Sequence, residues 1–146
     1  MTKNREKLSS LIYRINKMLK RDLQEQLKPY GITTDQWMVL RRIYLSSGEY
    51  NQKELAEASF RERAAITRMV DIMEKKNLIE RRNSPNDRRE YLLYITPKGK
   101  AAYEATEADV AESQEKINSI LKNSELNTLI KLMSKLERGM QGNTGK

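Results

Sequence analysis

The stretch SPNDRREYLLYIT, residues 84–96, places three charged side chains, Asp87, Arg88 and Arg89, within a run of turn-forming residues. Strand-like residues lie on both sides of this turn, which is the pattern of a β-hairpin with a charged tip. An arginine held at such a tip can enter the narrow minor groove of DNA, where the electrostatic potential is most negative. We expect Asp87 to pair with an arginine and brace the turn, because DNA would repel a free carboxylate. The same charges would also suit an ordinary solvated hairpin.

A second group of residues could read base edges, and it lies on a helix predicted just before the hairpin. Apolar residues at the spacing of one helical face indicate this helix, namely Ile66, Met69, Val70 and Met73. Its opposite face carries Arg61, Ala64, Arg68 and Asp71, with Thr67 at the edge of that face. In a major groove Arg68 could donate two hydrogen bonds to guanine, Thr67 could offer its hydroxyl and methyl, and Ala64 could contact a thymine methyl. A solvated helix face is the alternative explanation of this pattern.

The residues around these two groups predict a helix-turn-helix followed by a hairpin. A short helix is expected from Asn51, which is a capping residue type. A tight connection leads into the helix described above, and strands follow at residues 78–82 and 91–95. In this geometry the second helix of the pair can lie in a major groove. Arg81 and Arg82 would then lie along the stem of the hairpin, near phosphates.

Amphipathic helices are predicted before and after this unit. Apolar residues at steps of three and four predict a helix over residues 8–27. Another should start at Thr33, the first residue of a capping-box pattern. A long helix is expected from Pro97 to Leu121, and a final one from Ser124.

The composition excludes several classes of protein. The chain of 146 residues has a formal net charge of +8, which suits a polyanionic partner or solubility alone. It contains neither Cys nor His, the usual ligands of transition metals and, for His, the commonest general base. There is also no nucleophile elbow, phosphate-binding glycine loop or metal motif, so we predict no enzyme, no cofactor and no metal site. Without a signal peptide or a long apolar run, a cytoplasmic protein with no membrane partner is expected.

The motifs at this spacing resemble those of MarR-type winged-helix transcription regulators, over nearly the whole chain. GITTDQWMVL is similar to the start of the family's second helix, and RAAITRMVDIMEKKNLIERR to its recognition helix and first wing strand. DRREYLLYITPKGK contains the wing signature, with Asp87 and Arg89 in its acidic and basic places. Thr96 and Gly99 take the closing places of that signature. Asn77 stands where the family usually has Gly, and Asn tolerates the positive φ that such a position often needs.

The resemblance implies a mainly α fold with a small β-hairpin wing. Residues 31–96 would form the winged helix-turn-helix domain, and residues 1–30 and 97–146 a helical dimerisation region. The protein would act as a repressor, binding double-stranded palindromic operator DNA as a homodimer with recognition helices one DNA turn, roughly 34 Å, apart. The residues predicted to contact DNA are Asn51, Gln52, Lys53, Arg61, Arg63, Ala64, Ala65, Thr67, Arg68, Arg81, Arg82, Asp87, Arg88 and Arg89.

Members of this family often bind a small anionic or phenolic ligand between the dimer region and the winged domain. The resemblance therefore implies an effector that releases the protein from DNA. Tyr13, Trp37 and Arg41 are the residues we would place near such a cleft, and Trp37 also fits core packing.

Two other classes of protein would explain part of the pattern. A sequence-independent architectural DNA-binding protein would account for the charge but not for the wing pattern. A protein-only interaction module would account for the apolar stripes on the helices but not for the basic hairpin. Salt dependence distinguishes these two classes from a specific regulator. The DNA affinity of any DNA-binding protein falls with salt, and only a specific regulator keeps a large preference for one palindrome.

Overall fold

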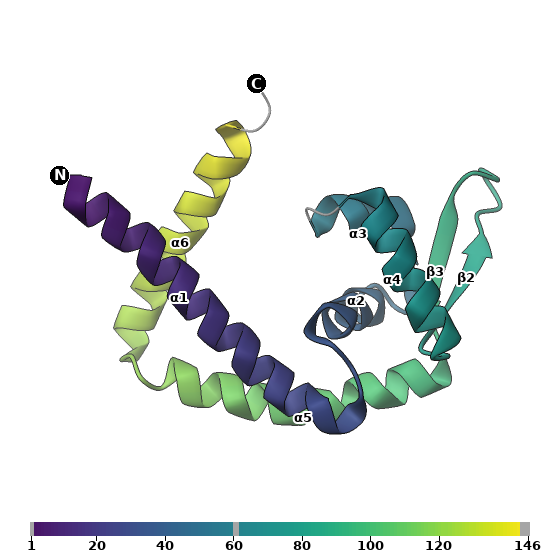
Figure 1. The fold of residues 1–146 in the computed structure, drawn as a ribbon, viewed down its shortest axis with the longest axis horizontal. Coiled ribbons are helices and arrows are strands. Elements are labelled where there is room, and N and C mark those ends of the chain that lie inside the picture. The colour runs from purple at the N-terminus through teal and green to yellow at the C-terminus, as the bar shows by residue number, and fades with distance from the viewer. Residues whose placement is uncertain (1, 60–61, 144–146) are drawn as a thin grey trace. The chain divides into compact units, whose positions relative to one another are not determined.

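The structure, a computed structural model, describes residues 2–59 and 62–143, with side chains from residue 7 onward. Helices dominate it, together with one small antiparallel sheet (Figure 1). In chain order the elements are α1 (Thr2–Leu27), the 3-10 helix η1 (Lys28–Tyr30), α2 (Thr34–Leu45), β1 (Glu49–Asn51), α3 (Gln52–Ala58), α4 (Arg63–Lys75), β2 (Ile79–Asn83), β3 (Tyr91–Ile95), α5 (Pro97–Asn118) and α6 (Asn123–Asn143). This order confirms the mainly α fold with a hairpin wing. Within the described residues, no helix is long and apolar enough to cross a membrane.

The chain divides into two compact units, Met1–Val110 and Ala111–Lys146, and the division falls within α5. The first unit holds a single apolar core to which α1, α2, α3, α4, β2, β3 and α5 all contribute. Its fully buried side chains include Leu27, Leu40, Leu55, Val70, Leu93 and Tyr103. In the second unit, none of the described residues is buried.

The start of α2 confirms the predicted capping box. The Gln36 backbone N–H donates to Thr33 Oγ1 at 3.2 Å, and the Thr33 N–H donates to Gln36 Oε1 at 3.3 Å. Two of the amides that a helix start leaves without an intrahelical partner are satisfied in this way. Ile32 and Trp37 are buried on either side of the cap, which fixes the angle at which the chain enters α2.

The sheet has three strands in the order β1-β3-β2, so the predicted two-stranded hairpin was incomplete. The additional strand, β1, pairs antiparallel with β3, and Tyr50 lies opposite Leu93. A strand of three residues is too short to show an alternation of apolar and polar side chains. The hairpin itself, β2 with β3, forms as expected and projects beside α4 (Figure 1).

The last turn of α4 and the first turn of α5 are joined through Asn77 and Thr96. Asn77 adopts the left-handed conformation with φ of 59°, as its place in the motif predicts. The Thr96 hydroxyl donates to the Asn77 carbonyl at 2.6 Å and accepts the Gly99 N–H at 3.0 Å, so it caps α5 as predicted. The Thr96 N–H donates to the Leu78 carbonyl at 3.1 Å.

The predicted extension of the long helix to Leu121 was wrong. Helix α5 ends at Asn118, and Ile120 and Leu121 lie in the turn that follows. Their backbone N–H groups donate three residues back, to Ile117 and Asn118, which tightens the chain out of the α-helical path. Apolar residues at helical spacing continue through this turn, and for that reason the sequence predicted a longer helix.

Candidate nucleic-acid interface

Helices α3 and α4 form the expected helix-turn-helix pair. The Asn51 side chain caps α3 by accepting the Lys53 N–H at 2.8 Å. Leu55 and Ala56 on α3 and Ile66 on α4 are buried in the shared core. Helix α4 begins at Arg63, after a residue that makes no side-chain cap.

The amphipathic character of α4 is confirmed. Its buried side consists of Ile66, Val70 and Met73. Ala64, Thr67 and Arg68 are exposed along the other side, and Ala65 is half-buried at its edge. Arg63 is also exposed, whereas the predicted Arg61 lies outside the described residues. A row of exposed side chains of this kind is what a major groove can accommodate.

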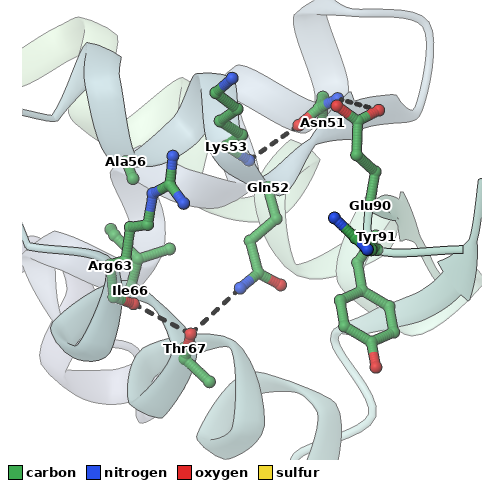
Figure 2. Close-up of a pocket in the computed structure, with 10 residues that line it drawn as sticks. Asn51, Gln52, Lys53, Ala56, Arg63, Ile66, Thr67, Glu90 and Tyr91 are labelled. Carbon is green, nitrogen blue, oxygen red and sulfur yellow. Dashed lines mark hydrogen bonds between the residues drawn. The ribbon is translucent and has the colours of Figure 1, made fainter. Parts of the chain in front are cut away.

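The hydroxyl of Thr67 is already engaged within the protein. It donates to the Arg63 carbonyl at 2.9 Å and accepts from Gln52 Nε2 at 3.2 Å, so Gln52 bridges α3 to α4 (Figure 2). A hydroxyl has a single proton, so none is left for a base acceptor. The methyl group is therefore the part of Thr67 best able to read a base. Arg68 Nε donates to the Ala64 carbonyl at 3.4 Å, and among the residues that the structure describes no other hydrogen bond engages the end of its guanidinium.

The wing tip, residues 84–90, is ordered by short-range hydrogen bonds. Asp87 Oδ1 accepts the backbone N–H of Arg89 at 2.9 Å, and the Asp87 carbonyl accepts the Glu90 N–H at 3.1 Å. The Ser84 N–H closes the turn by donating to the Glu90 carbonyl at 3.0 Å. Asp87 thus braces the turn, but it does so through the main chain, and in the described part of the chain no ion pair joins it to an arginine. Arg88 and Arg89 are both exposed.

A pocket of about 360 Å³ lies where α3, α4 and the wing meet (Figure 2). Three cationic side chains line it, Lys53, Arg63 and Arg89, together with Gln52 and Thr67. One carboxylate is also present, that of Glu90, which accepts a hydrogen bond from Asn51 Nδ2 at 3.4 Å. Residues that are far apart in the sequence therefore form one positively charged surface, which we call the interface pocket.

The two stem arginines have different surroundings. Arg82 Nη2 donates to Glu80 at 3.1 Å, and its guanidinium lies over the Tyr94 ring at 4.3 Å from the centroid. This hydrogen bond raises the pKa of the Arg82 guanidinium further above its usual value. Arg81 Nη2 donates instead to Asp71 of α4, at 2.7 Å. Asp71, predicted on the outer face of α4, is half-buried against the wing by this ion pair.

The three residues assigned to an effector site are only partly brought together. Trp37 is part of the core, and its Nε1 donates to Thr106 Oγ1 at 2.8 Å, while its ring lies 5.6 Å from that of Tyr103. Arg41 is exposed but lies near the Tyr103 hydroxyl, where it opposes the rise in the pKa of Tyr103 that burial and the Glu107 charge produce. Tyr13 is exposed on α1, with the Lys17 ammonium over its ring at 5.0 Å.

Hydrogen bonds between aromatic side chains and α5 were not anticipated from the sequence. The Tyr30 hydroxyl donates to Asp109 at 3.1 Å, and the Tyr44 hydroxyl donates to Glu104 at 3.0 Å. Each carboxylate raises the pKa of the tyrosine that it accepts from, because the hydrogen bond favours the protonated hydroxyl. These bonds tie α5 to η1 and α2.

Known proteins share the fold of this chain and part of its sequence. A sequence model of the MarR family matches residues 32–91. A mutant of MarR from E. coli, in a crystal structure with operator DNA, is 32% identical, over 88% of this chain and 92% of that chain, with a TM-score of 0.82. AbsC, a MarR family transcriptional regulator from Streptomyces coelicolor, is 22% identical, over 97% of both chains, with a TM-score of 0.89. MepR from S. aureus, in a complex with DNA, is 22% identical, over 90% of this chain and 96% of that chain, with a TM-score of 0.83.

These likenesses extend over the same elements that carry the candidate interface. The matched residues 32–91 run from the start of α2 to the first residue of β3, and so include the whole helix-turn-helix pair and the wing tip. Members of this family are DNA-binding transcriptional regulators and not enzymes. With 32% identity over nearly all of the E. coli protein, this chain belongs to the MarR family of winged-helix transcriptional regulators.

Proposed function

We propose that this protein is a sequence-specific transcriptional repressor that binds palindromic operator DNA as a homodimer. The observation that carries the proposal is the convergence of Lys53, Arg63 and Arg89, from three elements, on the interface pocket beside the exposed side of α4. Convergent cations attract phosphates and hold a protein in one register on the duplex. E. coli MarR, which is 32% identical to this chain, was crystallised with operator DNA, and this supports DNA as the partner.

In this proposal α4 lies in the major groove and the wing tip reaches the adjacent minor groove. Arg68 donates from the end of its guanidinium to a guanine, and the methyl group of Thr67 contacts a thymine. Arg89 enters the minor groove, with its position set by the Asp87 turn. Lys53, at the start of α3, contacts phosphate and carries no base preference.

Exposed apolar side chains support the homodimer. On α1 they are Leu8, Leu11, Ile12, Ile15 and Leu19, and on α6 they are Leu129, Ile130, Leu132, Met133 and Leu136. Each set follows the spacing of one helical stripe, and stripes of this size on a monomer mark an interaction surface. We propose that residues 1–30 and 97–146 form the dimerisation region and residues 31–96 the DNA-binding domain.

We also propose that a small anionic or phenolic ligand releases the repressor. The proposal rests on the family resemblance and on the position of Arg41 near Tyr103, whose ring lies 5.6 Å from that of Trp37. A cation beside aromatic rings suits a ligand of that chemistry. Melting curves with salicylate or benzoate would test it, because a bound ligand raises the melting temperature and Arg41→Ala should abolish that rise.

The function is tested by selecting from a pool of random duplexes at about 150 mM salt, where nonspecific attraction is screened. A palindrome with half-sites about one turn apart is the expected result. Binding without any enriched sequence would contradict the repressor and support an architectural DNA-binding protein. No binding to DNA at low salt would contradict both.

Replacing Arg89 with Ala should weaken binding to the selected palindrome by about 1.5–3 kcal/mol, the range for hydrogen bonds to charged groups. The loss should be largest for operators whose outer steps are A·T, where the minor groove is narrow. Fluorescence anisotropy titrations on duplexes with A·T or G·C outer steps measure both effects. Lys131→Ala, an equal loss of charge on α6, is the control. Unchanged binding by Arg89→Ala would show that the wing tip does not contact DNA.

Two substitutions at Thr67 show whether its methyl group or its hydroxyl contacts the base. Thr67→Val keeps a methyl group and should keep the base preference. Thr67→Ser keeps the hydroxyl but lacks the methyl, and should lose about 1 kcal/mol of preference for one thymine. Titrations with duplexes carrying thymine or uracil at each half-site position identify the contact, since uracil lacks that methyl. The opposite ranking of the two variants would mean that the hydroxyl reads the base.

A further inference from the structure

Arg81 lies in the middle of β2, and its side chain is turned toward the core side of the sheet. In the antiparallel register it stands opposite Leu93, which is fully buried. Residues directly opposite one another point to the same side of a sheet. The Arg81 side chain is accordingly 18% exposed, compared with 56% for its neighbour Arg82. A side chain this enclosed is poorly placed to reach a phosphate.

Two hydrogen bonds connect Arg81 to α4. Its Nη2 donates to Asp71 Oδ1 at 2.7 Å, and its backbone N–H donates to Glu74 Oε2 at 3.0 Å. Asp71 and Glu74 are three residues apart and so lie on one face of the helix. The Tyr91 ring, from β3, lies over the guanidinium at 5.2 Å from its centroid. One residue of the wing is thus held by two carboxylates of the recognition helix.

We propose that Arg81, Asp71 and Glu74 form a brace, which we call the Arg81 brace, that sets the angle between α4 and the wing. Arg81 is then a positioning residue and not a DNA contact. This inference rests on the proposed function, because the angle matters for binding only if α4 and the wing tip enter adjacent grooves together. A two-stranded hairpin is marginally stable by itself, so its orientation depends on what its stem is attached to.

The direction in which one substitution changes DNA affinity distinguishes the brace from an effect of charge alone. Asp71→Ala removes a negative charge close to the proposed DNA surface and frees Arg81, and both changes would tighten binding if charge alone decided affinity. Loss of the brace should instead weaken binding to the selected palindrome about tenfold, within the range of coupling between contacting residues. The preference for that palindrome over a scrambled duplex should fall with it.

Glu80→Ala is the matched control for Asp71→Ala. It removes the same charge, and Glu80 also pairs with an arginine of β2 at 3.1 Å. That pair lies within one strand and does not reach α4, so its loss should leave the palindrome preference unchanged. Asp71→Asn keeps the shape of the side chain without its charge. It should give a smaller loss in the same direction as Ala and serves if the Ala variant does not fold.

The double variant of Asp71→Ala with Arg81→Ala measures the coupling directly. If the two residues act through one brace, the double variant should bind the palindrome with no lower affinity than the single variant that binds more weakly. If Arg81 contacts a phosphate, Arg81→Ala should weaken binding to all sequences equally. It should also lower the slope of log affinity against log salt by about one. That result would overturn the brace.

Hydrogen exchange on the protein without DNA tests the brace separately from the proposed function. The Ser84 and Glu90 amides close the wing tip, and their exchange should be several-fold faster in Asp71→Ala and Arg81→Ala than in the parent or in Glu80→Ala. Equal exchange rates in all four proteins would overturn the brace, as would tighter binding by Asp71→Ala with its preference intact. If the parent protein selects no sequence, the proposed function fails, while the exchange rates still decide whether the brace exists.

Discussion

Leu129→Glu is expected to abolish the proposed homodimer and to weaken binding to the selected palindrome by about 10²- to 10⁴-fold. A dimer engages two half-sites at once, and the second contact is made at the high effective concentration that the first provides. A monomer loses that advantage although its own α4 and wing are unchanged. The expected loss therefore exceeds that of any single contact to a base.

The reason for choosing this position is the exposure of the apolar stripe on α6. Leu129, Ile130, Leu132, Met133 and Leu136 are between 40% and 55% exposed in the single chain. A carboxylate at the centre of an apolar interface would be buried without a partner, which costs several kcal/mol or excludes the second chain. In the single chain the same carboxylate faces solvent, so the fold itself should be retained.

Sedimentation equilibrium and DNA titration together test this expectation. Asn127→Glu is the control, because Asn127 is an exposed polar residue on the same helix, about half a turn away from Leu129. Asn127→Glu should leave both the mass of the oligomer in solution and the affinity for the palindrome unchanged. A Leu129→Glu protein that remains a dimer would show that this part of α6 is not the interface. A monomer with full affinity would show instead that the dimer is not needed for binding.

Gly99→Ala is expected to destabilise the protein by about 3 kcal/mol or more, because the added methyl group would collide with the main chain. A Cβ built on Gly99 lies 2.0 Å from the Leu78 carbonyl oxygen and 2.9 Å from its carbon. That carbonyl accepts the Thr96 N–H at 3.1 Å and belongs to the connection between α4 and β2. Neither side can shift without breaking the start of α5.

Urea denaturation of the parent protein and the variant measures this effect. Gly139→Ala provides the control, since a Cβ at Gly139 meets nothing within 4 Å on α6. That substitution should stabilise the helix by roughly 0.5–1 kcal/mol, from helix propensity alone. A Gly99→Ala protein of parental stability would mean that the two segments are farther apart than the structure shows. Glycine is needed at this place of the wing motif because the start of α5 approaches the Leu78 main chain closely, and not because the residue has a positive φ.

Patterns within a short segment were predicted well because they depend on neighbours along the chain. The periodicity of α4 and the Thr33 capping box both follow from interactions within a few residues, whereas the left-handed Asn77 was expected from the family resemblance. The hairpin and its charged tip follow in the same way from turn formers between two strands. The exceptions are the short strand β1 and the end of α5, where a local pattern was absent or misleading.

Partners that come from distant segments could not be predicted in this way. Arg81 and Arg82 are adjacent in the sequence, yet one binds α4 and the other binds within its own strand. Asp87 binds a backbone amide where a guanidinium was expected.

Apart from β1 and the end of α5, the sequence by itself determined the main helices and the hairpin of this protein, their order and the excess of cations on the hairpin and the helix before it. Only the tertiary structure decided which of those side chains are already engaged, as with the Thr67 hydroxyl and the Arg81 guanidinium, and which remain available to DNA. The physical reason is that element formation depends on local backbone hydrogen bonds and side-chain spacing. The choice of partner depends instead on which faces of the elements the packed core brings together.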